Sequence, residues 1–420
     1  MISESWRRLG RNRIFDIAAV MVAVSAIFLW SVRVPPRWSD SDFSYYYVSS
    51  RMLLKGQNPY TTPLKAMSQE LGFRFSEEFP IAGYPPSFLR LFAPLAALPP
   101  RIAFAVWVSM EIGCLVVILW LTHRLLGERL SGRGWLFVAA LAISSRTVAY
   151  HLVYSQIQLL LAALVLAGYA AHRAGKHGWG CLAVSIAGIL KFYPFILLPW
   201  LIWSSGGGVR ARLYRVLGVI VLVLAGVALT GPALWRDFLQ HGIPMAVGEE
   251  IGRNFHFSLP ALVTNLGYAH HDFHPSPAAK QWWWFMGTMT GLVVIASAYC
   301  VCMATPRDSE AQFSLLCVAM LVGTVTMQGH YFVFLVFPLT VAATRIAAKP
   351  TPVHVVGLIL LVLAVNCVDP PDTPFLWRHP VWYLLVGDIP LYGLLGLGVF
   401  FGHELWSHRK LTLNPAYGQD

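Results

Sequence analysis

The chain has 420 residues, of which 56% are hydrophobic and only 12% are charged, whereas soluble domains carry about 25% charged residues. Because a transmembrane helix takes about 20 residues, twelve such helices would use roughly 240, close to the hydrophobic share of this chain. The composition excludes a soluble enzyme, a disordered chain and a β-barrel, whose strands alternate polar and apolar residues. The net charge of +11 does not indicate a nucleic-acid partner, because the basic residues lie dispersed in short segments between apolar runs.

The first apolar run, residues 14–34, follows a basic start that contains Arg7, Arg8 and Arg13. It has no small-residue cleavage site and is followed by further apolar runs, so we interpret it as a retained membrane anchor. The later predicted helices lie at residues 101–122, 134–150, 157–171, 213–230, 282–304, 311–327, 331–344, 352–368 and 381–402.

The apolar run 178–204 has a lysine, Lys191, at its centre, followed by Phe192-Tyr193-Pro194. Proline disfavours helix at the preceding residue, which predicts a break there. Each half of the run has about 12 residues and a length of roughly 18 Å, too short to cross a hydrocarbon core of about 30 Å. We therefore predict a hairpin of two short helices with Lys191 near its tip, facing a cavity inside the protein.

Counting the hairpin as two helices gives about twelve transmembrane helices, with the short basic loops and both termini in the cytoplasm. Two long loops, at about 35–100 and 231–281, then lie on the extracytoplasmic face. The sequence thus predicts an all-α polytopic membrane protein, with one integral-membrane domain over 1–408 and a cytoplasmic tail over 409–420. Long loops on one face only are unusual in transporters, whose repeats tend to be symmetric.

The first long loop contains two aspartates, Asp40 and Asp42, just before an amphipathic stretch at residues 43–54. Either carboxylate could simply cap the helix that follows, or one of them could act as a general base at the membrane surface. Further on, Tyr84-Pro85-Pro86 precedes a second predicted helix over 87–98, since proline is common in the first turn of a helix.

Two polar features interrupt the apolar helices. A lysine within an apolar run is costly in a membrane and indicates an anionic partner or a substrate pathway, although Lys191 could also extend toward the interface. Gln156 and Gln158 open the run at 157–171. They either pair with neighbouring helices or bind a polar ligand.

The second long loop alternates polar and aromatic residues around Arg253 and Asn254, a pattern typical of a sugar site and also of a loop packed on the membrane. A histidine-rich segment follows, but it lacks the helical spacing of a metal site; its members are His270, His271 and His274. His330 lies between two apolar runs at the predicted outer mouth of the bundle. Taken alone, it would be a histidine at the membrane interface whose hydrogen-bonding groups are satisfied by its neighbours.

The order of these short motifs resembles glycosyltransferase family 87, which includes polyprenyl-phosphate-mannose-dependent mannosyltransferases. The motifs, spread over residues 14–400, are Asp42-x-x-Tyr45-Tyr46, Leu54-x-Gly56-x-x-Pro59-Tyr60, Tyr84-Pro85-Pro86, Gln156 with Leu159-Leu160, Lys191 with Pro194, Asn254 with Ser258-Leu259-Pro260, and His330. The chain departs from the family at Ser155, where a glycine is common, and at Gln328-Gly329 near the late histidine.

The resemblance implies a GT-C-type helical bundle in a bacterial plasma membrane, with an extracytoplasmic active site. It implies a polyprenyl-phosphate sugar as donor, with mannose as the expected sugar, a lipid or glycan as acceptor, and no metal or other cofactor. Asp42 matches the catalytic base, and Lys191 and His330 match positions near the donor phosphate or the acceptor. Further substrate contacts are expected from Arg253, Asn254, Gln156, Tyr45 and Tyr84, and a second cation beside Lys191 from Arg253 or Arg51.

Two other functions fit parts of the sequence. A transporter or flippase of a lipid-linked sugar would also need an intramembrane lysine and an open cavity. A membrane subunit that only binds another protein would leave Lys191 unexplained. The long loops on one face and the aspartate on the predicted outer side favour the enzyme.

Overall fold

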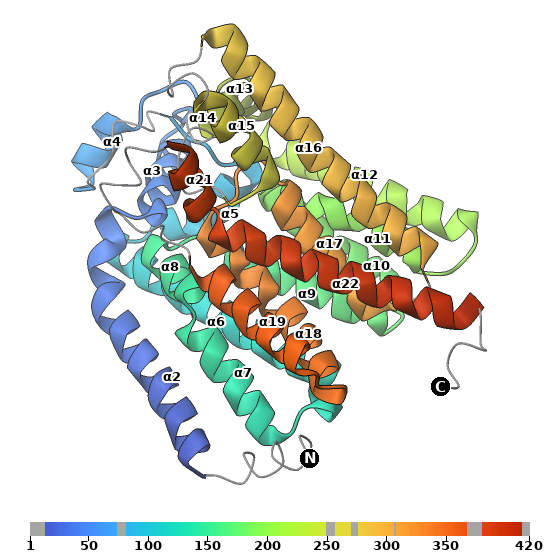
Figure 1. Cartoon of the computed structure of the whole chain (residues 1–420). Coiled ribbons are helices and arrows are strands. Elements are labelled where there is room, and N and C mark those ends of the chain that lie inside the picture. The colour runs from blue at the N-terminus through green and yellow to red at the C-terminus, as the bar shows by residue number, and fades with distance from the viewer. Residues whose placement is uncertain are drawn as a thin grey trace. The chain divides into compact units, whose positions relative to one another are not determined.

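The computed structural model describes residues 13–73, 81–248, 257–269, 276–305, 308–367 and 380–413. Within these ranges all regular secondary structure is helical, as the sequence predicts. Figure 1 traces the chain in order. It divides into two compact units: unit 1 comprises residues 1–25, 122–148 and 250–420, and unit 2 comprises 26–121 and 149–249.

Unit 2 contains most of the first predicted loop and the helical hairpin around Lys191. Its helices are η1 (Pro35–Ser39), α3 (Asp42–Leu54), α4 (Lys65–Glu70), α5 (Pro86–Ala96), α9 (Gln158–Arg173), α10 (His177–Leu190), η3 (Tyr193–Leu197), α11 (Leu198–Ser204), α12 (Val209–Thr230), α13 (Pro232–Asp237), η4 (Phe238–Gly242) and α14 (Ile243–Gly248).

Unit 1 contains two helices from residues 127–144 and the C-terminal helices. They are η2 (Gly127–Arg129), α7 (Gly132–Ser144), α15 (Leu259–Ala269), α16 (Pro277–Ala304), α17 (Ser309–Gly323), η5 (Gly329–Leu335), α18 (Val336–Ala348), α19 (Pro352–Asn366), α21 (Pro380–Gly387) and α22 (Ile389–Leu413). Three helices contain a boundary between the units: α2 (Arg13–Arg33), α6 (Pro100–Leu126) and α8 (Arg146–Tyr154).

Among the described residues, five helical segments are long and apolar enough to cross a membrane, or six if a bent pair is counted as one span. The five are Asp16–Leu54, Pro100–Leu126, Val209–Thr230, Pro277–Ala304 and Gly329–Ala348. A polytopic membrane protein is therefore supported. The number of about twelve transmembrane helices stays a prediction, because several of the predicted apolar runs form helices of only 10–17 residues.

The bent pair lies where the sequence predicts a single helix over 134–150. Instead, α7 and α8 meet at Ser145 at an angle of 44°. Ser145 is extended (φ −61°, ψ 139°), and the side-chain oxygen of Asn366 accepts the backbone N–H of Arg146 at 3.1 Å. A side chain that satisfies a freed backbone group makes such a break tolerable in an apolar region.

The predicted hairpin in unit 2 is present. α10 ends at Leu190, and the chain returns through η3 and α11, which both pack against α10. Gly188 makes the close return possible, because a Cβ at this position would collide with the ring of Phe195. The break at Lys191 therefore depends on a glycine one turn earlier as well as on Pro194.

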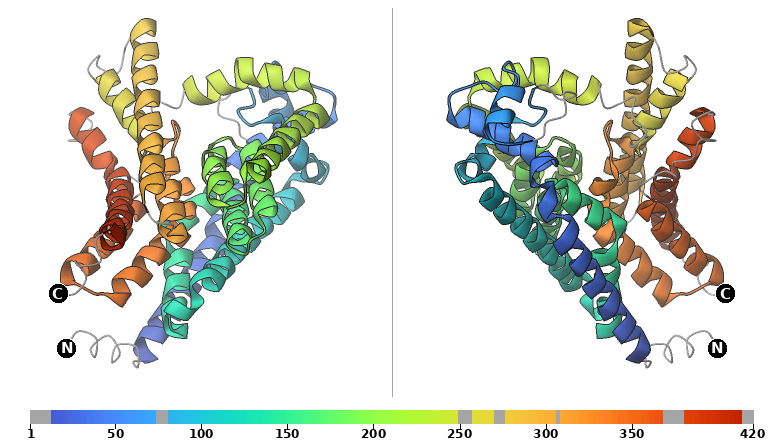
Figure 2. Two further views of the ribbon diagram at one scale, coloured as in Figure 1. Left: turned by 90° about the vertical axis from the view of Figure 1, so that its right-hand side faces the viewer. Right: turned by 90° about the vertical axis from the view of Figure 1, so that its left-hand side faces the viewer.

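In unit 1, α15 and α17 both pack against α16. Figure 2 shows α15 beside the N-terminal part of α16. A Cβ at Gly287 of α16 would lie 2.5 Å from the carbonyl oxygen of Pro260 in α15. Glycine at such a contact lets helix backbones approach closely, as is common between membrane helices.

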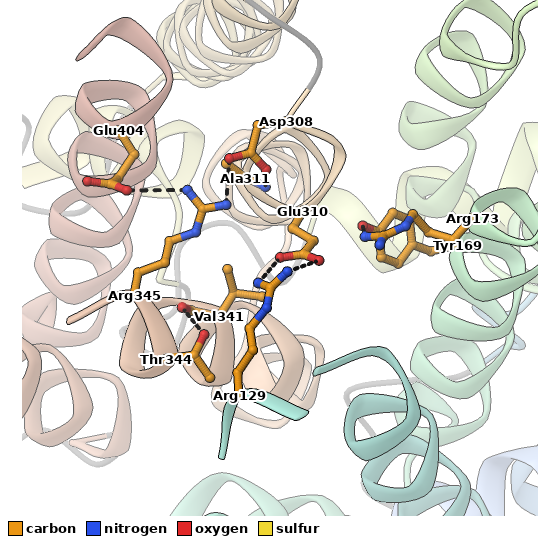
Figure 3. A network of polar contacts seen from close by, with 10 residues as sticks. All are labelled: Arg129, Tyr169, Arg173, Asp308, Glu310, Ala311, Val341, Thr344, Arg345 and Glu404. Carbon is orange, nitrogen blue, oxygen red and sulfur yellow. Dashed lines mark hydrogen bonds and ion pairs between the residues drawn. The ribbon is translucent and has the colours of Figure 1, made fainter. Parts of the chain in front are cut away.

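A cluster of charges joins several helix ends of unit 1 (Figure 3). Arg129 binds Glu310 through two hydrogen bonds of 2.5 and 3.0 Å. Arg345 bridges Asp308 at 2.6 Å and Glu404 at 3.2 Å. The predicted topology assigns all these loops to the cytoplasmic side, and the cluster places the start of α17, the end of α18 and the later part of α22 close together.

Candidate active site

The position of the candidate base depends on how α3 packs in unit 2. α3 and α5 are neighbours. The hydroxyl of Tyr47 donates to the carbonyl of Leu98 at 2.6 Å, and the hydroxyl of Ser50 donates to the carbonyl of Leu89 at 2.9 Å. These hydrogen bonds, with the buried aromatic side chains of α3, fix the helix and so fix its first residue, Asp42.

The two aspartates of the first loop have different surroundings. Asp40 forms an ion pair with Arg37 at 3.2 Å, and its side chain is 40% exposed. Asp42 is half-buried, and its Oδ2 accepts a hydrogen bond from the hydroxyl of Tyr84 at 3.0 Å. Neither aspartate caps α3, because the N-cap residue is Ser41, which makes no side-chain capping bond. The simple capping interpretation is therefore wrong.

Tyr84 is itself held firmly at its backbone. The hydroxyl of Tyr60 donates to the carbonyl of Tyr84 at 2.6 Å, and the N–H of Ala82 donates to the carbonyl of Pro59 at 2.9 Å. Burial raises the pKa of Tyr60 well above its usual range, so this hydroxyl stays protonated and remains a donor. Since α5 begins just after Tyr84, the phenol is presented from a fixed turn.

Lys191 approaches the same place from the hairpin tip. It follows α10 in an extended conformation (φ −159°, ψ 123°), and its ammonium nitrogen lies 5.6 Å from the centre of the Tyr84 ring, within the range of a cation–π contact. Its charge also acts on the Asp42 carboxylate. The hydroxyl of Ser87 in α5 donates to the carbonyl of Ile189 at 2.6 Å, which ties the hairpin to the helix that follows Tyr84.

Gln156 joins this group through Tyr46 of α3. The Tyr46 hydroxyl donates to the Oε1 atom of Gln156 at 3.2 Å, and the Tyr46 and Tyr84 rings meet edge to face with centroids 4.6 Å apart. The structure thus brings together four residues of the sequence prediction, which are Asp42, Tyr84, Lys191 and Gln156. The first and last of them, Asp42 and Lys191, are 149 residues apart in the sequence.

The other predicted residues have different locations. Tyr45 is half-buried one turn after Asp42 on α3. His330 is buried in η5 of unit 1, and Arg253 and Asn254 lie outside the described residues. Arg51 donates to the carbonyl of Ala96 at 3.0 Å, so in this structure it serves to hold α3 on α5.

The sequence interpretation missed two buried residues beside this group. Glu111 is in the middle of α6, and His151 is near the end of α8; their side chains are 1% and 0% exposed. His151 lies close enough to Lys191 for an electrostatic interaction with its charge. A signal was present, because an acidic residue in the centre of the apolar run 101–122 is as costly as a lysine.

Within the described ranges, no group of three His, Cys, Asp or Glu side chains is arranged to hold a metal ion. The histidine-rich segment at 270–274 lies outside those ranges. The chemistry that the described group can support is that of one carboxylate, one phenol and one ammonium ion.

Comparison with known proteins adds the family. The sequence model of glycosyltransferase family 87 matches residues 83–338, which is more than half of the chain and includes Tyr84, Gln156 and Lys191. Asp42 lies before the matched range. No curated protein gives a significant match. The extent of the family match shows that this chain belongs to glycosyltransferase family 87.

Proposed function

We propose that this protein is an inverting glycosyltransferase that moves a hexose, with mannose as the expected sugar, from a polyprenyl-phosphate donor to a lipid or glycan acceptor. The observation that carries the proposal is the convergence of Asp42, Tyr84 and Lys191 in a chain of this family. The family supports glycosyl transfer, and the three side chains suit a donor whose leaving group is a phosphate.

Asp42 is the proposed general base. The acceptor hydroxyl must lose a proton as it attacks the sugar, and a single carboxylate within hydrogen-bond reach can take it. The hydrogen bond from Tyr84 fixes the orientation of one carboxylate oxygen, Oδ2. The other oxygen can then face the acceptor.

Lys191 is the proposed partner of the donor phosphate. In the reaction the acceptor oxygen bonds to the anomeric carbon, the bond from that carbon to the phosphate oxygen breaks, and the electron pair stays on the phosphate. The acceptor proton goes to Asp42. A preorganised cation stabilises the charge that develops on the leaving phosphate, and phosphate is a good enough leaving group to need no strong acid. One displacement inverts the anomeric configuration.

We place this reaction at the extracytoplasmic face of a bacterial plasma membrane, within a multi-pass GT-C-type bundle whose termini are cytoplasmic. The charge cluster of Arg129, Glu310, Arg345, Asp308 and Glu404 supports this topology. It gathers loops that the positive-inside rule assigns to the cytoplasm. An ion pair of 3.1 Å between Arg133 and Asp16 likewise joins the start of α7 to the start of α2.

The direct test incubates purified protein with a panel of polyprenyl-phosphate sugars and measures loss of each donor, with and without candidate acceptors. The proposal predicts consumption of at least one donor, including slow hydrolysis without acceptor, and predicts that the Asp42→Asn variant is nearly inactive. A protein that binds and moves these lipids across vesicle membranes without breaking the sugar–phosphate bond would instead be a transporter.

A further inference from the structure

Glu111 and His151 form a buried polar contact that the proposed chemistry does not use. The His151 Nε2 and Glu111 Oε2 atoms are 2.8 Å apart, and both side chains are at most 1% exposed. This contact joins the middle of α6 to the end of α8.

The chain between α8 and α9 is strained and is clamped by the same face of α6. Ser155 has a φ of 53°, the only positive value for a non-glycine residue in the described part of the chain, and such values tend to occur at functional sites. Trp107, one turn before Glu111 and on the same helix face, donates its indole N–H to the carbonyl of Ser155 at 3.0 Å. Two side chains of α6 thus hold this break.

The clamped break carries Gln156. Its backbone N–H donates to the carbonyl of His151 at 3.3 Å, and its side chain accepts from Tyr46. Tyr46 packs against Tyr84 and also lies 5.8 Å from the Trp107 ring. A continuous set of contacts therefore runs from Glu111 to the hydroxyl that orients Asp42.

We propose that Glu111 and His151 are positioning residues, which fix the α8–α9 break and so place Gln156 and Tyr46 behind the Tyr84–Asp42 hydrogen bond. This inference rests on the proposed function. Because neither residue touches the reacting atoms, their loss disturbs the orientation of the base and leaves the charge that binds the donor phosphate in place.

The test measures kcat and donor KM for purified variants. Glu111→Gln and His151→Phe are each expected to lower kcat about tenfold or more, as small displacements of catalytic groups do, with donor KM within about twofold of the wild type. The double variant should cost no more than either single variant, because residues that act as one unit are not additive.

Two replacements of His151 separate the hydrogen bond from simple packing. Glutamine carries its amide nitrogen near the position of Nε2, whereas asparagine carries it near Nδ1. We expect His151→Gln to restore kcat to within about threefold of the wild type, and His151→Asn to remain as slow as His151→Phe. Equal recovery by both amides would overturn the role of the Nε2 contact.

The matched control is Glu310→Gln in unit 1. Glu310 is also a buried carboxylate, 4% exposed, and it is bound to Arg129. Its replacement therefore lowers the stability of the protein but leaves the Glu111–His151 contact and the α8–α9 break unchanged. Its kcat should stay at the wild-type value. If the wild type is active and the Glu111 and His151 variants match its kcat, the inference is wrong and the proposed function stands. If the wild type consumes no donor, the proposed function fails first and removes this inference with it.

Discussion

The assignment of the base to Asp42 can be tested by one pair of isosteric changes. Asp42→Asn keeps the shape of the side chain and still offers an oxygen to the Tyr84 hydroxyl, which lies 3.0 Å from the carboxylate in the structure. The variant should therefore fold and keep the local geometry. It removes only the proton acceptor, so the rate of transfer should fall about 10²- to 10⁴-fold, the usual contribution of a general base.

Asp40→Asn is the matched control, two residues earlier. Asp40 pairs with Arg37, and the two side chains are 40% and 33% exposed. Such surface pairs contribute about 0–1 kcal/mol to stability, and no described contact links this pair to Tyr84 or Lys191. We therefore expect the transfer rate of this variant to stay within about twofold of the wild type.

The assay is a single turnover of labelled donor with enzyme in excess, so that product release does not mask the chemical step. Donor affinity, measured separately, should be similar in both variants and the wild type, because Lys191 is unchanged. Normal transfer by Asp42→Asn, or loss of transfer in Asp40→Asn alone, would refute the reasoning. The search for the base would then move to Asp40, Glu249, Glu250 and His330.

Three further predictions follow from the same structure. Lys191→Ala should weaken donor binding and slow turnover strongly. Lys191→Arg should restore part of both, because arginine keeps the charge but changes the geometry. Unchanged kinetics in the alanine variant would remove Lys191 from the site. Ser155→Gly relieves about 1–2 kcal/mol of backbone strain. It costs about 0.5–1 kcal/mol in chain entropy and about 1 kcal/mol for the hydrogen bond from the Ser155 hydroxyl to the carbonyl of Leu152. Its melting temperature should therefore stay close to that of the wild type, and a fall as large as these two losses together would mean that the break is not strained. In a cysteine-free background, Lys65→Cys and Pro244→Cys should react with an impermeant thiol reagent from outside the cell. Lys176→Cys should react only from the cytoplasm. The reverse pattern would contradict the predicted topology and, with it, the assignment of a polyprenyl-phosphate donor.

Hydropathy and proline placement were enough to predict most of the helices. The amphipathic stretch after Asp42 is α3, the prolines after Tyr84 open α5, and the lysine with its nearby proline marks a real helix break. These features are local, because helix starts and breaks depend on a few neighbouring residues. The bend at Ser145 was missed, since it depends on Asn366, more than 200 residues away.

The candidate site could be predicted only in part for the same reason. The sequence indicated Asp42, Tyr84, Lys191 and Gln156 one by one, but gave no means of knowing that the Tyr84 hydroxyl binds Asp42 or that Tyr46 links Gln156 to Tyr84. The first pair forms because α3 packs against α5, and the second because α3 lies beside the break between α8 and α9. Arg51 was considered as a phosphate contact because of its charge, and only the structure shows it donating to the carbonyl of Ala96.

The buried carboxylate of Glu111 illustrates a different kind of omission. It lies in an apolar run, and placing an ionisable side chain in a membrane costs free energy. This cost alone indicates that the residue has a role. Its partner, His151, lies just past the end of another predicted run, where a histidine attracts little notice. Only the 2.8 Å contact between them shows that the two form one unit.

The measurement that tests the central claim most directly is the anomeric configuration of the transferred sugar. With whichever polyprenyl-phosphate sugar the purified protein consumes, nuclear magnetic resonance of the product reports the configuration at the new glycosidic bond. A single displacement assisted by Asp42, with phosphate leaving beside Lys191, predicts inversion relative to the donor. Retention of configuration would require a second displacement and a covalent sugar–enzyme intermediate, and would contradict the assignment of Asp42 as a base.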